Sequence, residues 1–187
     1  MPTLKLYMFL LGGRPTARNT EQHDIFFGIG ENIKDLIPEM IRFWPEAKRN
    51  LHVDAWREVT TVNGYTIEVM ERDDDMIDEK EDLLFFINLG GYKKGLFDEP
   101  HFKLLTVQKK KSHAVKIAKD TLFYIEAGYP GADSHIDEHY GLDIDDIHNV
   151  RDILPYDQKY KYTLNITPGE NNKDDELHLG YFKLSSF

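Results

Sequence analysis

The chain contains no cysteine, which excludes disulfide bonds, thiol nucleophiles and thiolate metal sites. It also lacks any apolar run near the roughly 18 residues that a membrane-spanning helix needs. The apolar run Leu6–Leu11 is too short for the core of a signal peptide, and no small-residue cleavage site follows it. These absences fit a reducing compartment without requiring one, and we expect a protein that lies in the cytoplasm and not in a membrane.

Basic residues are in deficit, with 23 Lys and Arg against 33 Asp and Glu and a formal net charge of −10. Such a field disfavours binding to nucleic acid or to anionic membranes. The one basic run, Lys109–Lys111, has no interleaved aromatic residues and reads as a solvated edge. Motifs of nucleotide-binding loops, zinc proteases and serine hydrolases are also missing. The partner expected is therefore a small molecule or another protein, including a second copy of the chain.

What the chain does contain is a repeat. The segment Leu6–His23 returns as Leu84–His101 at an offset of 78 residues, without a gap. Each copy has an apolar run, then a glycine pair, then a histidine at a fixed distance. A short continuous apolar run predicts a strand in the centre of a sheet. No helix start follows the glycine pairs, so we expect them to form a turn or to let another backbone approach, and not to bind phosphate; they are Gly12, Gly13, Gly90 and Gly91.

The order of elements after the first copy predicts a β-β-α-β-β unit over residues 1–71. Strand 23–29 is followed by a helix over 33–44, in which Pro38 should kink the helix or mark its true start. Strands 51–56 and 65–69 follow, with Asn63-Gly64 as a hairpin turn. The charged segment 72–82 is interpreted as a linker.

A second unit is expected over residues 83–187. Strands 84–89 and 101–107 precede a helix that starts near Ser112. His135-Ile136-Asp137 then matches His52-Val53-Asp54 at an offset of 83, and strand 162–166 matches strand 65–69. An insertion near 143–156, with a short helix at 145–154, and an extra strand at 177–184 complete the unit. The predicted fold is α+β: two tandem β-β-α-β-β repeats with mostly antiparallel sheets, related by a pseudo-two-fold axis.

Three features occur in tandem copies: Leu-Gly-Gly after an apolar strand, a His that opens the next strand, and a later His-x-Asp. Together they resemble domain of unknown function 1543, an uncharacterised and mainly bacterial family. The resemblance covers residues 4–70 and 83–167, and the insertion and the last strand are where the chain departs from it. The family has no established activity, so the resemblance implies no mechanism, cofactor or partner.

The repeated polar residues are the candidate functional cluster: His23, His52, Asp54, His101, His135 and Asp137. Residues i and i+2 of a strand project to one face, so His52 and Asp54 should lie together. His135, Asp137 and His139 offer three ligands on one strand face and are the candidate site for a divalent metal ion. A histidine held by a carboxylate can also act as a base. The alternative is structural, because such residues also bond to nearby backbone groups.

Two functions stay open at this point. The first is a non-enzymatic binding or interaction module built from a duplicated unit. The second is a metal-dependent or acid-base enzyme that uses the His and Asp sets. Nucleic-acid binding on a sheet surface ranks below both because of the acidic charge.

Overall fold

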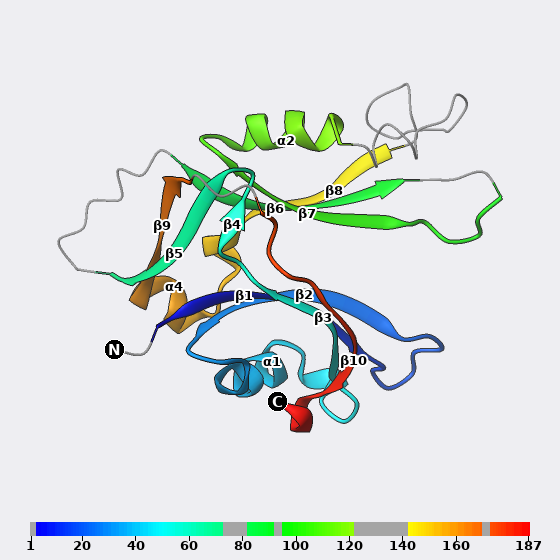
Figure 1. The fold of residues 1–187 in the computed structure, drawn as a ribbon. Coiled ribbons are helices and arrows are strands. Elements are labelled where there is room, and N and C mark those ends of the chain that lie inside the picture. The colour runs from blue at the N-terminus through cyan, green and yellow to red at the C-terminus, as the bar shows by residue number, and fades with distance from the viewer. Residues whose placement is uncertain (1–2, 73–81, 92–94, 122–141, 170–172) are drawn as a thin grey trace. The chain divides into compact units, whose positions relative to one another are not determined.

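A computed structural model describes residues 3–72, 82–91, 95–121, 142–169 and 173–187 (Figure 1). The expected α+β class is confirmed, and all the strand pairs of these residues are antiparallel. The chain divides into two compact units. Unit 1 contains Met1–Ile77 and Ile153–Phe187, and unit 2 contains Asp78–Asp152.

The main sheet of unit 1 has the strand order β10-β3-β1-β2. The strands are β1 (Lys5–Gly13), β2 (Gln22–Gly30), β3 (His52–Glu58) and β10 (His178–Lys183). The apolar run of β1 lies inside the sheet, with Leu6, Phe9 and Leu11 at most 1% exposed. The sequence predicted that this strand would lie in the centre of a sheet. In the structure it has a neighbouring strand on each side.

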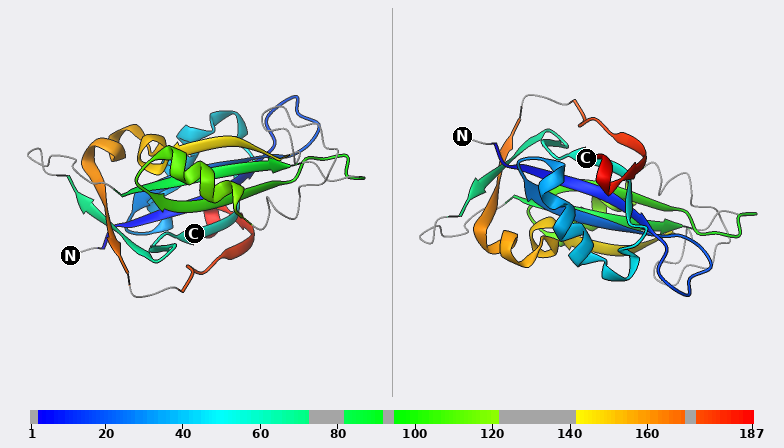
Figure 2. Two further views of the ribbon diagram at one scale, coloured as in Figure 1. Left: turned by 90° about the horizontal axis from the view of Figure 1, so that it is seen from above. Right: turned by 90° about the horizontal axis from the view of Figure 1, so that it is seen from below.

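One face of this sheet is covered by a short helical segment (Figures 1 and 2). A 3-10 turn (Ile33–Leu36), α1 (Ile37–Phe43) and a second 3-10 turn (Pro45–Ala47) follow one another. Pro38 lies in the first turn of α1, where its missing N–H costs no helical hydrogen bond. The proline thus marks the true start of the α-helix. Leu36 and Met40 are buried against Phe9, Leu11 and Val53 of the sheet.

A second sheet of unit 1 contains β4 (Thr61–Val62), β5 (Tyr65–Glu71) and β9 (Tyr162–Pro168), in that order. The predicted Asn63-Gly64 turn is confirmed, with φ of 39° and 83° for the two residues. The helix α4 (Tyr156–Lys161) directly precedes β9. Its Gln158 side chain accepts a hydrogen bond from the N–H of Ile29 at 2.7 Å and donates one to the C=O of Ile29 at 2.9 Å. This amide therefore caps the outer edge of β2.

Unit 2 is a three-stranded sheet with one helix. Its strands are β6 (Leu83–Gly91), β7 (His101–Gln108) and β8 (Leu142–Asn149), in the order β7-β6-β8. The helix α2 (Lys111–Lys119) lies along one face of the sheet (Figure 2), and a 3-10 turn (Val150–Ile153) follows β8. Ala114 and Ala118 of α2 pack on Phe85, Ile87 and Leu89 of β6.

The structure differs from the sequence interpretation in the C-terminal half. Residues 142–149 form strand β8 beside β6, so the segment expected to be an insertion with a short helix is largely an integral strand of unit 2. The extra strand expected in the second unit is β10, and it pairs with β3 of unit 1. The strand expected at His135–Asp137 lies outside the described residues.

Candidate functional site

A β-bulge in β3 creates the polar site of unit 1. Leu10 faces Ala55 and Leu11 faces Val53, so Asp54 is an extra residue without a partner on β1. A bulge of this kind re-aims a side chain within a strand. His52 and Asp54 therefore both lie on the sheet face opposite Val53, while Trp56 returns to the core side and packs there.

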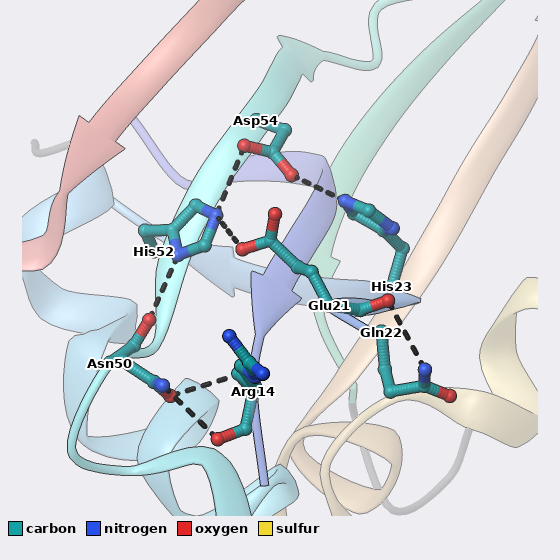
Figure 3. A network of polar contacts seen from close by, with 7 residues as sticks. All are labelled: Arg14, Glu21, Gln22, His23, Asn50, His52 and Asp54. Carbon is teal, nitrogen blue, oxygen red and sulfur yellow. Dashed lines mark hydrogen bonds and ion pairs between the residues drawn. The ribbon is translucent and has the colours of Figure 1, made fainter. Parts of the chain in front are cut away.

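Four side chains converge around this bulge, two from β3, one from β2 and one from the residue before β2 (Figure 3). Nε2 of His52 lies 3.1 Å from Oε1 of Glu21 and 3.2 Å from Oδ1 of Asp54. The second carboxylate oxygen of Asp54 lies 3.0 Å from Nε2 of His23. We call this set the His52 cluster: Glu21, His23, His52 and Asp54.

The orientation of the His52 ring is fixed by the backbone. Its Nδ1 lies 2.8 Å from the carbonyl oxygen of Asn50, and a carbonyl only accepts, so Nδ1 carries a hydrogen. In the neutral form of this ring, Nε2 carries no hydrogen, and its lone pair faces the two carboxylates. The His52 side chain is only 3% exposed. Nε2 of His52 and Oδ2 of Asp54 are buried without a hydrogen bond, although both lie at ion-pair distance from charged groups.

Gly12 of β1 makes room for the cluster. A Cβ at this position would overlap Nε2 of His52 and come within 2.5 Å of Oδ2 of Asp54. On the other face, a Cβ on Gly13 would come within 2.7 Å of the Ala47 Cβ. Both glycines are paired residues of β1, and neither has a positive φ. The turn geometry expected for them is therefore wrong; these residues are glycine because neighbouring side chains approach the backbone closely.

An aromatic ring from β10 covers the edge of the site. The Tyr181 ring lies 4.2 Å from the His52 ring. On the side of Trp56, His178 of the same strand stacks on the Trp56 ring at 3.8 Å with an interplanar angle of 9°. Tyr181 is itself 64% exposed, so one face of the His52 ring is screened from water by a ring that remains solvated. The C-terminal strand thus contributes to the burial of His52.

Unit 2 repeats this geometry in part. Gly90 of β6 faces His101 on β7 and Asp143 on β8, as Gly12 faces His23 and His52. Asn88 pairs with Asp146 and Leu89 with Ile144, so Asp145 is the extra residue of a bulge. Nε2 of His101 lies 3.0 Å from Oδ2 of Asp145. A Cβ on Gly90 would come within 2.6 Å of that carboxylate and 2.8 Å of Glu99.

The predicted site residues fall into three groups. His23, His52 and Asp54 are brought together, and His101 lies in the matching position of unit 2. His135, Asp137 and His139 lie outside the described residues. The strand that pairs with β6 is β8, which has Asp143 at the register position of His52 and Asp145 in its bulge.

Sequence reasoning also missed the two glutamates of the sites, Glu21 and Glu99. Their signal was available, because they lie at the same offset of 78 residues as the glycines. In the part of the chain that the structure describes, no group of three or more His, Cys, Asp or Glu side chains is already arranged to hold a metal ion. Within the same ranges, no helix has the length and apolar character required to cross a bilayer.

Comparison with known proteins confirms the expected family resemblance in unit 1. Residues 18–69 match the family described as Domain of Unknown Function (DUF1543), a segment that includes all four residues of the His52 cluster. No protein with a curated description matches the chain.

One solved structure similar over nearly the whole chain is the crystal structure of a protein Il1583 from Idiomarina loihiensis. It is 20% identical, with a TM-score of 0.63, and the match covers 97% of this chain and 98% of that chain. At this identity the likeness concerns the fold alone.

Proposed function

We propose that the protein is a binding module and that the His52 cluster of unit 1 holds a cation. The observation that carries this proposal is the environment of His52. Its Nε2 is buried, has no hydrogen bond and faces the carboxylates of Glu21 and Asp54. A buried lone pair beside two negative groups is unfavourable unless a positive charge lies among them.

The charge of the cluster favours a cation as its ligand. With both imidazoles neutral and both carboxylates ionised, the His52 cluster carries a formal charge of about −2. The chain as a whole carries a net charge of −10, which raises the local concentration of cations. The His52 cluster is also partly open, with the Glu21 side chain 47% and the His23 side chain 44% exposed.

The proposal is tested by titrating protein without a histidine tag, stripped with chelator, with divalent cations in a calorimeter. Binding to the wild type and loss of binding in His52→Ala is the expected result. His113→Ala is the matched control, because His113 is exposed on α2 and outside both sites. Equal binding by the wild type and His52→Ala would place the ligand elsewhere and contradict the proposal.

An acid-base enzyme is the second candidate function. The contacts from His23 through Asp54 to His52 form a chain of titratable groups, and the Asn50 carbonyl orients the His52 ring. Such an oriented imidazole is suited to proton transfer. A reaction rate that vanishes in His52→Gln, in protein freed of bound metal, would favour this candidate over the binding module.

We also propose that the two units are copies of one β-β-α-β-β unit. Support comes from the matching glycine, histidine and bulged aspartate positions of β1–β3 and of β6–β8. Superposition of the two three-stranded sheets in a crystal structure tests this, and a different bulge position in unit 2 would contradict it. A bacterial source and a cytoplasmic location remain predictions from the sequence. Fractionation of the native host would check the location.

A further inference from the structure

We propose that the cation held by the His52 cluster is a transition-metal ion of the Zn²⁺ class. Its ligands would be the Nε2 atoms of His52 and His23 together with the carboxylates of Asp54 and Glu21. This inference rests on the proposed cation-binding function and names the chemical class of the ligand.

The donor atoms favour this class over Ca²⁺ or Mg²⁺. Imidazole nitrogen is a preferred ligand of Zn²⁺ and related ions, whereas the hard cations are bound by oxygen atoms. The His52 cluster offers two imidazole Nε2 atoms and two carboxylates, each within ion-pair distance of at least one other member. A mixed nitrogen and oxygen set of this kind is typical of zinc sites.

The hydrogen bond from His52 to the Asn50 carbonyl is of the kind that orients histidine ligands in metal sites. Histidine ligands commonly donate their second ring N–H to a backbone carbonyl, which fixes the tautomer and leaves the other nitrogen to the metal. In this chain Nδ1 donates to the Asn50 carbonyl at 2.8 Å. Asn50 is held in turn, since its side chain exchanges two hydrogen bonds with the Arg14 backbone at 3.1 Å.

The contacts of His52 Nε2 have a spacing close to that between ligands of a tetrahedral site. Zinc bonds of roughly 2.0 Å to nitrogen and oxygen place neighbouring ligands about 3.3 Å apart around a tetrahedron. The three donor–acceptor distances within the His52 cluster are 3.0, 3.1 and 3.2 Å. The two contacts of His52 Nε2 are therefore close to tetrahedral edges, whereas His23 faces the other oxygen of Asp54 and would have to turn toward the common point.

Binding would still require side-chain rotation, because the described side chains do not yet surround a common point. Glu21 precedes β2 and its side chain is 47% exposed, so it has room to turn. His52 is 3% exposed and is held by Asn50, so it is the fixed ligand around which the others adjust. Asp54 is placed by the bulge, with Oδ1 toward His52 and Oδ2 toward His23.

Unit 2 supplies an internal comparison. The register position of His52 is taken by Asp143, so the matching site has one histidine, His101, among its described residues. A site with one imidazole should bind Zn²⁺ more weakly than a site with two. The high-affinity zinc site should therefore survive the substitution His101→Ala.

The test is isothermal titration of the stripped, untagged full chain with ZnCl₂, and separately with CaCl₂ and MgCl₂. Wild type should bind Zn²⁺ far more tightly than Ca²⁺ or Mg²⁺. His52→Ala should weaken the binding by about 100-fold or more, since even the loss of an outer-shell partner costs roughly 10- to 100-fold. His23→Ala, at a side chain 44% exposed, gives a second variant that leaves the buried ring in place. His101→Ala should change the tight site by less than about threefold.

The outcomes separate the two proposals. Tight Zn²⁺ binding that depends on His52 and His23 supports both. Binding of Ca²⁺, Mg²⁺ or an organic cation at the His52 cluster without preference for Zn²⁺ overturns the zinc assignment and leaves cation binding standing. Absence of binding by every cation overturns both proposals. Tight Zn²⁺ binding that is unchanged in His52→Ala and His23→Ala but lost in His101→Ala also overturns the assignment to unit 1.

Discussion

Replacement of Gly12 by alanine should disrupt the His52 cluster by a purely steric effect. The added Cβ would overlap Nε2 of His52 and lie 2.5 Å from Oδ2 of Asp54. Real Cβ contacts do not occur at such distances, so the imidazole and the carboxylate must both move. The His52 ring has little space for this, because it is 3% exposed and is held by the Asn50 carbonyl.

The magnitude follows from two opposing terms. Glycine inside a strand is ordinarily less stable than alanine by roughly 0.5–1 kcal/mol, which would favour the substitution. Overpacking in a closed site costs about 1–3 kcal/mol. The net expected change is a loss of about 1–2 kcal/mol in unfolding free energy, equivalent to a fall of about 3–6 °C in Tm for a chain of this size class.

A double-mutant cycle measured by urea denaturation isolates the steric term. Gly12→Ala should destabilise the wild type but be neutral or stabilising in the background His52→Ala/Asp54→Ala, where the colliding groups are gone. The coupling free energy should equal the overpacking term, about 1–3 kcal/mol. Gly90→Ala is the matched change in unit 2 and should show the same sign. Equal effects of Gly12→Ala in the two backgrounds would refute the view that this glycine exists to accommodate the cluster.

Three further predictions concern other parts of unit 1. Gln158→Ala removes both hydrogen bonds to the Ile29 backbone and should cost about 1–3 kcal/mol, with faster amide exchange at Ile29; Gln22→Ala, at an exposed glutamine, should change neither. Burial raises the pKa of the Tyr7 phenol above its ordinary value of 10.0, so its contribution to stability is complete below that pH and is lost as the pH rises through the higher folded value. Tyr7→Phe should therefore reduce the alkaline loss of stability in denaturation curves between pH 9 and 11, and an unchanged pH dependence would contradict this. Asp54→Asn keeps the shape of the bulged residue but removes its charge, and should lower cation affinity by about tenfold with a change in Tm below about 3 °C; a large loss of stability with unchanged affinity would indicate a structural role.

Local patterns in the sequence predicted the elements of unit 1 well. The continuous apolar run of β1, the Asn63-Gly64 turn and the position of Pro38 each depend on a few neighbouring residues. The convergence of His52 and Asp54 was also accessible, because both the i, i+2 rule and the bulge place them on one face. What a local pattern cannot supply is the identity of the strand across the sheet. The pairing of β10 with β3 joins residues more than 120 positions apart.

In unit 2 the sequence comparison relied on residue identity and matched His-x-Asp at 135–137, which lies outside the described residues. The strand that pairs with β6, as β3 pairs with β1, is β8. In β3 the core-facing residues are Val53 and Trp56, three apart, because the bulge at Asp54 shifts the alternation. In β8 the corresponding residues are Ile144 and Ile147, also three apart. Apolar spacing interrupted by an aspartate was therefore the better signal than the polar identity, since burial constrains a strand more strongly than a single histidine does.

The most direct test of the central claim is the state of the two ring nitrogens of His52, measured by long-range ¹H–¹⁵N NMR before and after addition of ZnCl₂. The proposed site predicts that Nδ1 keeps its proton, bonded to the Asn50 carbonyl, and that the Nε2 resonance moves as Zn²⁺ binds. A His52 ring that stays protonated on both nitrogens, with unchanged resonances at saturating Zn²⁺, would contradict the claim. In that case the positive charge between the carboxylates would be a proton, and the cluster a buried ion pair.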